Sequence, residues 1–367
     1  MTATLRSSFA YNSPPPADHT VARVLAAGSA LDLPGVDTTW AREIANWGRE
    51  AGALDEESVS RDWASLVREF YTYRAAEAAR LLNPYDPAPI TPRTPVAVRS
   101  DADRARRWGV REWSRLTALT RRRGAAANYD AECAATITFN AALRVLAGWL
   151  GDRRQELLAA RAAATAAVEA RIDESTITVL ASMWCETAVR VGDAVAAMPA
   201  GQLATTHSGG DVEPWMRLRA VVAHAEACRV AGKPARAARL LSGVEVGELV
   251  DACPSGEWRV VAARARLAGP GQAVGLWVRA IALARAGRDP VVEAELTVSL
   301  ALAHKAAGEF VEASGAVASA IALLTVLGPG AALRRAHDLA ARVVPAAREQ
   351  ITDDLAPSLP GRGHCAA

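Results

Sequence analysis

The sequence lacks the motifs that carry most enzyme chemistry. The patterns HExxH, GxSxG, GxxxxGKS/T and GxGxxG do not occur, and the six histidines have no partner spacing typical of a catalytic or metal site. The five cysteines are widely spaced and contain no CxxC, which disfavours a disulfide framework and a zinc site. We therefore expect a protein that is not an enzyme, with no catalytic residues, no cofactor and no metal.

One pair of residues has side chains that could bind a metal together. His224 and Cys228 are four residues apart and share one face of a predicted helix. Two ligands without a third or fourth do not make a metal site. The same positions line the predicted helix contacts, so we favour a packing role for both side chains.

Aromatic residues are also scarce, at 5% of the chain, and lysine occurs only at Lys233 and Lys305. Alanine dominates an apolar content of 51%. Alanine has the highest helix propensity, whereas strands favour β-branched and aromatic residues. No stretch alternates with a period of two, so the composition predicts an all-α protein.

Long apolar runs are missing as well. The most apolar run, "AVASAIALLTVL" at 316–327, is too short to span a bilayer, and the first residues contain no apolar core of a signal peptide. The formal net charge of +2 is too small to indicate nucleic-acid binding by itself. With free cysteines expected, we predict a cytoplasmic protein without a membrane segment.

Proline and glycine divide the chain into segments. The segment "NPYDPAPITPRTP" cannot form the interior of a helix, because each proline removes a backbone donor. We therefore place a domain boundary there. The predicted parts are a disordered tail (1–18), an N-terminal helical module (19–82), a Pro-rich linker (83–99), a helical region with degenerate repeats (100–172), a repeat array with a capping helix (173–349) and a second disordered tail (350–367).

Glycines recur at a regular interval from Gly151 onward. Each of them follows one apolar-periodic helix and precedes another, at separations of 41, 40, 37 and 39 residues: Gly151, Gly192, Gly232, Gly269 and Gly308. Repeats of this length are typical of stacked helical hairpins. The spacing predicts an array of antiparallel hairpins, an α-solenoid.

Two of the units, "VAHAEACRVAGKPARAARLL" and "LALAHKAAGEFVEASGAVAS", can be aligned directly, and there the sequence resembles the tetratricopeptide-repeat family. Small residues fill the positions at which that family's two helices approach each other closely: Ala225, Ala237, Ala301, Ala313 and Ala320. The resemblance covers 213–327 and weakens upstream. It implies a curved array whose concave groove binds a protein or peptide.

If the glycines mark the turns, Arg229, Arg266 and Lys305 occupy the same position of three successive first helices. Arg219 and Arg259 flank them, with Glu226 and Glu295 opposing. Such a row of cations suits the carboxylates of an acidic segment or a peptide C-terminus. We therefore predict these five basic residues as the partner-binding site, while a solvated helix face in an Arg-rich protein is the alternative.

A second functional hypothesis concerns the N-terminal half. Similar arrays in GC-rich, actinobacterium-like genomes often form the sensor part of regulators with an N-terminal DNA-binding module, and residues 99–123 are rich in arginine. Against this, acidic residues stand where a recognition helix would begin and would repel phosphates. DNA binding is therefore our second hypothesis, and the sequence does not indicate an oligomeric state.

Overall fold

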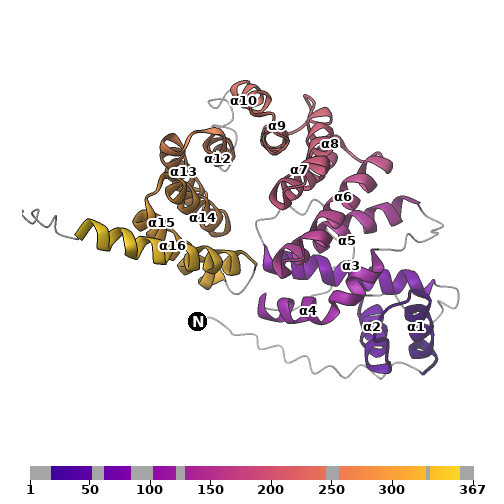
Figure 1. The fold of residues 1–367 in the computed structure, drawn as a ribbon. Coiled ribbons are helices and arrows are strands. Elements are labelled where there is room, and N and C mark those ends of the chain that lie inside the picture. The colour runs from indigo at the N-terminus through magenta and orange to yellow at the C-terminus, as the bar shows by residue number, and fades with distance from the viewer. Residues whose placement is uncertain are drawn as a thin grey trace, which may run out of the picture. The chain divides into compact units, whose positions relative to one another are not determined.

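The protein is almost entirely helical. The structure, a computed structural model, describes residues 18–51, 62–83, 102–120, 129–244, 256–327 and 331–355. These residues form fifteen α-helices and no strand, which confirms the predicted all-α class (Figure 1).

The helices belong to two compact units, and the division between the units falls inside the fifth helix. Unit 1 is Met1–Leu146 and unit 2 is Ala147–Ala367. In unit 1, α1 packs against α2 and α3, and α3 packs against α4. The helices of this unit are α1 (Asp18–Ala30), α2 (Thr38–Glu50), α3 (Trp63–Leu82), α4 (Ala102–Leu119) and most of α5 (Tyr129–Leu150).

The predicted linker at 83–99 lies outside the described residues, except for Asn83. The helices on its two sides, α3 and α4, nevertheless pack against each other within unit 1. Unit 1 therefore continues across the position at which the sequence places a boundary, and 19–82 does not stand apart from the helix that follows. The division between units falls inside α5, where neither proline nor glycine clusters mark it.

Unit 2 consists of consecutive helices joined by short turns. They are α6 (Arg153–Glu169), α7 (Glu174–Val191), α8 (Ala194–Thr206), α9 (Pro214–Val230), α10 (Pro234–Ser242), α12 (Glu257–Leu267), α13 (Pro270–Ala286), α14 (Pro290–Ala307), α15 (Phe310–Leu327) and α16 (Ala331–Leu355). The predicted tail at 350–367 is thus helical as far as Leu355, and its remaining residues lie outside the described part of the chain.

Local signals explain where these helices begin and end. An aspartate side chain accepts a hydrogen bond from the first turn of α6, α7, α8 and α14, while proline occupies the first position of α9, α10, α13 and α14. Gly192 and Gly308 end α7 and α14 with φ of 84° and 80°, a conformation that L side chains rarely adopt. Gly269 is the exception, with φ −65° and ψ 160°, because the following Pro270 favours extended backbone.

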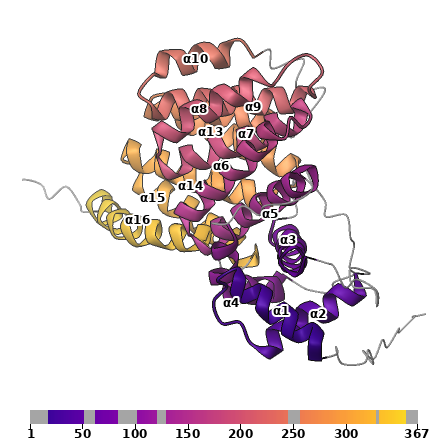
Figure 2. The ribbon, with the colours of Figure 1, turned by 90° about the vertical axis from the view of Figure 1, so that its right-hand side faces the viewer.

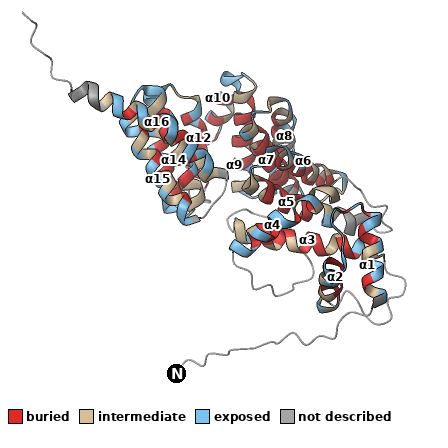
Figure 3. Ribbon diagram, turned by 60° about the horizontal axis from the view of Figure 1, so that its bottom comes forward, coloured by how far each residue is buried: buried red, intermediate tan, exposed pale blue. Residues whose placement is uncertain are grey.

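Each helix of unit 2 packs against the next described helix along the chain. Some helices also contact the described helix two places further along. These additional contacts join α7 to α9, α9 to α12, and α14 to α16. Figure 2 shows α7, α8 and α9 together in this arrangement, and Figure 3 shows the buried residues on the inner faces of the helices. The small residues predicted at helix contacts are at most 1% exposed: Ala225, Ala237, Ala301, Ala313 and Ala320.

A close contact between three helices of unit 2, at Gly201, yields a first prediction. A methyl group on Gly201 of α8 would lie 2.9 Å from the Cα atom of His224 in α9 and 3.3 Å from the sulfur of Cys185 in α7. Because backbone cannot yield as a side chain tip can, we expect Gly201→Ala to lower the free energy of unfolding by about 1–3 kcal/mol. Calorimetric melting of the full chain measures this loss.

The matched control is Gly315→Ala in α15, where a methyl group would meet nothing within 4 Å. Alanine has the higher helix propensity, so this variant should be more stable by about 0.5–1 kcal/mol. If both variants melt like the wild type, the close approach of α8 and α9 is contradicted.

One helix of the described chain is long and apolar enough to cross a membrane. The segment Cys133–Leu150 of α5 has this character, and 61% of it is buried inside the protein, as in a core helix. The sequence pattern instead singled out 316–327 as the most apolar run. The longer segment Cys133–Leu150 is interrupted by one charged residue, Arg144.

Candidate functional site

The predicted partner-binding arginines lie on two neighbouring first helices. Arg219 and Arg229 are on α9, and Arg259 and Arg266 are on α12, which packs against α9. Two glutamates, Glu186 of α7 and Glu226 of α9, each join two of these arginines. We call these six residues the charge ladder: Glu186, Arg219, Glu226, Arg229, Arg259 and Arg266.

Glu186 holds the first part of the charge ladder. Arg219 donates from Nε and Nη2 to the two carboxylate oxygens, at 2.8 and 2.7 Å, and Arg259 donates from Nη1 to Oε1 at 3.0 Å. The side chain of Arg219 is only 6% exposed. This bidentate pair therefore ties α9 to α7, and Arg219 presents little surface to a partner.

Glu226 holds the second part in the same way. Arg229, one turn further along α9, donates to Oε2 at 2.9 Å, and Arg266 of α12 donates to Oε1 at 3.3 Å. The Glu226 side chain is 8% exposed, whereas those of Arg229 and Arg266 are 31% and 36% exposed. The carboxylate is thus enclosed, and the two guanidinium groups reach the surface.

Tryptophan rings support the two arginines of α12. The guanidinium carbon of Arg259 lies 4.6 Å from the centre of the Trp258 ring, and that of Arg266 lies 5.2 Å from the centre of the Trp277 ring. Each guanidinium therefore contacts both a carboxylate and an aromatic ring. This arrangement restricts the side-chain rotamers before any ligand arrives.

Lys305 does not belong to the charge ladder. It lies in the last turn of α14, where its charge complements the negative end of the helix, and it makes no ion pair among the described residues. The expected opposition by Glu226 is observed, but Glu295 acts electrostatically on Arg335. The site prediction missed Glu186, although Glu186 and Glu226 each precede a turn glycine, Gly192 and Gly232, by six residues.

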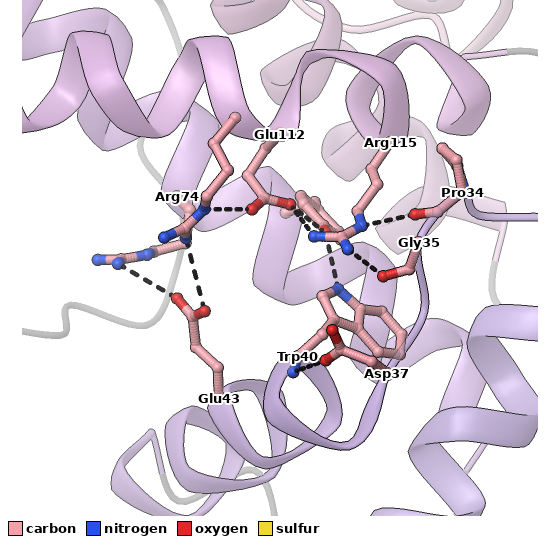
Figure 4. Close-up of polar contacts among 10 residues, drawn as sticks. Pro34, Gly35, Asp37, Trp40, Glu43, Arg74, Glu112 and Arg115 are labelled. Atoms are coloured by element: carbon pink, nitrogen blue, oxygen red, sulfur yellow. Dashed lines mark hydrogen bonds and ion pairs between the residues drawn. The ribbon is translucent and has the colours of Figure 1, made fainter.

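Unit 1 contains a buried polar network that the sequence did not reveal. The indole nitrogen of Trp40 donates to the Tyr71 hydroxyl at 2.9 Å, and that hydroxyl donates to Oε2 of Glu112 at 2.8 Å. Arg115 donates to the same oxygen at 2.8 Å and also reaches the carbonyl oxygens of Pro34 and Gly35 (Figure 4). The network connects α2, α3, α4 and the turn after α1.

The electrostatics of this network favour a charged Glu112. Burial by itself raises the pKa of Glu112, but hydrogen bonds from Arg115, Arg111 and Tyr71 outweigh burial and leave the pKa below its usual value. Burial, followed by the charge of Glu112, raises the pKa of Tyr71, which therefore stays a neutral donor. With every member engaged in holding helices together, the network has a structural role.

The remaining candidate ligands are buried in unit 2. His224 and Cys228 are 5% and 0% exposed, and the thiol of Cys185 donates to the carbonyl oxygen of Ala223 at 3.1 Å. Burial raises the pKa of both thiols and lowers that of His224. In the described chain, no three side chains of the types that bind metals come together.

Comparison with known proteins leaves the family open. No protein family and no characterised protein matches this sequence. The likeness to tetratricopeptide repeats therefore remains a resemblance carried by a few positions, and the functional argument depends on the charge ladder itself.

Proposed function

We propose that unit 2 is an array of helical hairpins, similar to tetratricopeptide repeats, that binds a protein or peptide partner and does not catalyse a reaction. The hairpins are α7 with α8, α9 with α10, α12 with α13, and α14 with α15, and α16 covers the end. Contacts between successive first helices, buried alanines at the close approaches and left-handed glycine turns support this arrangement.

The observation that carries the proposed function is that Arg229 and Arg266 use only part of their hydrogen-bond donors on Glu226. Both are held by Glu226, yet each directs only one nitrogen at it in a described hydrogen bond. A guanidinium has five N–H donors, so both retain donors at the surface for an incoming carboxylate. The partner is therefore an acidic segment or a chain terminus, and Lys305 adds a further positive charge one hairpin later.

A peptide titration tests this function. We expect a fluorescent peptide rich in Asp and Glu to bind the wild type and to bind the Arg229→Gln, Arg266→Gln, Lys305→Gln variant about tenfold more weakly or worse. The Lys233→Gln, Arg239→Gln, Arg342→Gln variant removes the same charges from exposed positions elsewhere and should bind normally. Circular dichroism establishes that both variants are folded.

The wild type alone provides a second readout. Binding should weaken as salt is added, because the attraction acts between partly exposed charges. Equal binding by both triple variants, or no binding of the acidic peptide by the wild type, contradicts the proposed function. Within this proposal the protein acts as a cytoplasmic adaptor or regulator.

A second candidate function, DNA binding by unit 1, is favoured by one observation. Arg104, Arg107 and Arg111 are exposed along one side of α4, at spacings of three and four residues. Arg111 also pairs with Glu112 and Glu43, at 2.8 and 3.6 Å, which reduces its availability to phosphates. A DNA-binding protein would be retained on heparin in a salt-dependent manner, and Arg104→Gln, Arg107→Gln would abolish the retention.

A further inference from the structure

His224 is enclosed where α8 and α9 of unit 2 pack against each other (Figure 2). It is 5% exposed, and its Nδ1 lies 3.2 Å from the hydroxyl oxygen of Thr205 in α8. A methyl group on Gly201 of α8 would lie 2.9 Å from the Cα atom of His224 and 3.3 Å from its Cβ atom. The two helices are therefore in close contact at this residue, and the imidazole is held between them.

The hydrogen bonds of Thr205 assign the tautomer of His224. The hydroxyl group of Thr205 has one hydrogen, which it donates to the carbonyl oxygens of Gly201 and Gln202, at 3.1 and 3.0 Å. The hydroxyl oxygen therefore accepts a hydrogen bond from Nδ1–H of His224, and Nε2 is the nitrogen without a proton. In the described part of the chain, this buried Nε2 has no hydrogen-bond partner. A basic nitrogen is thus enclosed without an acceptor for any proton that it takes up.

The side chains that face His224 favour the neutral ring. The helix α8 contains no titratable residue, and α7 places the thiol of Cys185 beside the same contact, where burial raises the thiol pKa and keeps it neutral. The helix α10 contributes Arg236, whose positive charge acts on the imidazole. Burial, followed by this charge, lowers the pKa of His224.

The other charged groups on the helices around α9 do not compensate a proton on His224. Glu186 of α7 and Glu226 of α9 are bound by the arginines of the charge ladder. Glu174 of α7 pairs with His207, and Glu257 of α12 pairs with Arg279. The remaining charged side chains of α7, α9, α10 and α12 are arginines. Each described carboxylate on these helices is therefore already engaged.

We propose that His224 makes the contact between α8 and α9 pH-sensitive, so that the contact opens when the imidazole takes up a proton in mildly acid solution. The imidazolium has a second N–H group, which would be buried without an acceptor and would lie close to the positive charge of Arg236. Both costs are removed when α8 moves away from α9 and Nε2 reaches water. Opening also exposes the place where α7, α8 and α9 meet, which is formed by Ala181, Ala204 and Ala220.

The direction of the pH effect follows from proton linkage. The pKa of His224 in the closed contact lies below its usual value of 6.5, so the open state takes up the proton first as the pH falls. The contact therefore has its full stability above about pH 6.5 and loses stability from there down to the pKa of the closed state. Within this window opening binds one proton, so the equilibrium constant for opening rises by up to about tenfold for each pH unit.

Amide hydrogen exchange of the full chain tests this contact. After correction for intrinsic exchange, the protection of amides in α8 and α9 should fall by about three- to tenfold between about pH 6.5 and 5.5. Amides of α13, a helix without histidine or carboxylate, provide the internal reference and should keep their protection. Unchanged protection of α8 and α9 in the wild type, or an equal loss in α13, overturns the proposal.

Variants identify the proton acceptor. His224→Phe keeps a ring between the helices and removes the basic nitrogen, so α8 and α9 should keep their protection over the same pH range. His224→Asn keeps a neutral donor for Thr205 and should behave alike, which provides a second test if phenylalanine prevents folding. His337→Gln removes an exposed imidazole on α16 and should retain the response of the wild type.

A fall in protection that persists in the folded His224 variants shows that another group takes up the proton, and it overturns the proposal. The exchange experiment contains no partner. Its result therefore does not depend on the peptide titration, and the failure of either proposal can be recognised separately.

Discussion

Replacing Glu112 with alanine is expected to lower the free energy of unfolding of unit 1 by about 3–5 kcal/mol, because the change leaves Arg115, whose side chain is only 15% exposed, without its carboxylate. Glu112 is 3% exposed and accepts hydrogen bonds from Tyr71, Arg115 and Arg111. Without its carboxylate, the Tyr71 hydroxyl loses its acceptor and the Arg115 guanidinium loses its counter-ion. Calorimetric melting of the full chain measures the effect.

Two further variants separate charge from packing. Glu112→Gln keeps the shape and one acceptor oxygen, so we expect a smaller loss than with alanine. Glu43→Gln removes a carboxylate that is 42% exposed and pairs with Arg74 at 3.8 Å, so its effect should stay within about 1 kcal/mol. A Glu112→Ala protein as stable as Glu43→Gln would show that the buried network does not hold unit 1 together.

The same network predicts the direction of the pH dependence. The pKa of Glu112 in the folded protein lies below its usual value of 4.5, so the unfolded chain binds the proton more readily. The stabilisation is therefore complete above the unfolded pKa and is lost as the pH falls through the folded pKa. Glu112→Gln should melt with a weaker dependence on pH below about 4.5 than the wild type.

The helices could be predicted from the sequence because their signals are local. Proline at Pro234 and Pro290, aspartate caps and glycines at Gly192 and Gly308 each act within a few residues of the helix end that they specify. The period of the apolar residues then fixes the buried face. These signals require no knowledge of which helix lies beside which.

The polar partnerships could not be predicted, because they join helices far apart in the sequence. Tyr71 and Glu112 are 41 residues apart, and Arg259 lies 73 residues from Glu186. Even a correct alignment of the repeats predicts only the face of the helix on which a side chain lies. Which carboxylate of the neighbouring helix it meets depends on crossing angles and rotamers, which the pattern does not encode.

The division between the compact units does not coincide with the Pro-rich segment. A Pro-rich segment indicates that a helix stops, but it does not indicate that the helices on its two sides separate. In unit 1, α3 and α4 pack together through Tyr71 and Glu112, so the chain returns to the same core after the segment. Composition identifies connections, whereas long-range packing decides which connections join domains.

The charge ladder combines structural support with surface charge. Arg219 is enclosed and holds α9 to α7, whereas Arg229 and Arg266 share a buried carboxylate and remain partly exposed. The four arginines predicted from the sequence thus share two glutamates, Glu186 and Glu226, which neutralise half of their charge. A partner must add to these pairs rather than meet isolated positive charges, which favours a ligand with its own carboxylates in register with the hairpins.

Glu186→Ala provides the sharpest test of this structural role, and we expect it to destabilise unit 2 by about 3–5 kcal/mol. The change removes both described hydrogen bonds of Arg219, whose side chain is 6% exposed, and one of Arg259. Glu174→Ala, also on α7, removes a 61% exposed carboxylate paired with His207 and should change stability by less than about 1 kcal/mol. Thermal melting of the two variants beside the wild type gives the comparison.

A double variant identifies the cause of that loss. If the cost of Glu186→Ala arises from an uncompensated cation, then replacing Arg219 as well, in Glu186→Ala, Arg219→Met, should recover a large part of it, because the enclosed Arg219 charge is then absent. If the stability losses of the two single variants simply add in the double variant, the loss caused by Glu186→Ala comes from packing of α7. In that case Glu186 would not organise the charge ladder, and the exposed arginines would have to be positioned by Glu226 and the tryptophan rings alone.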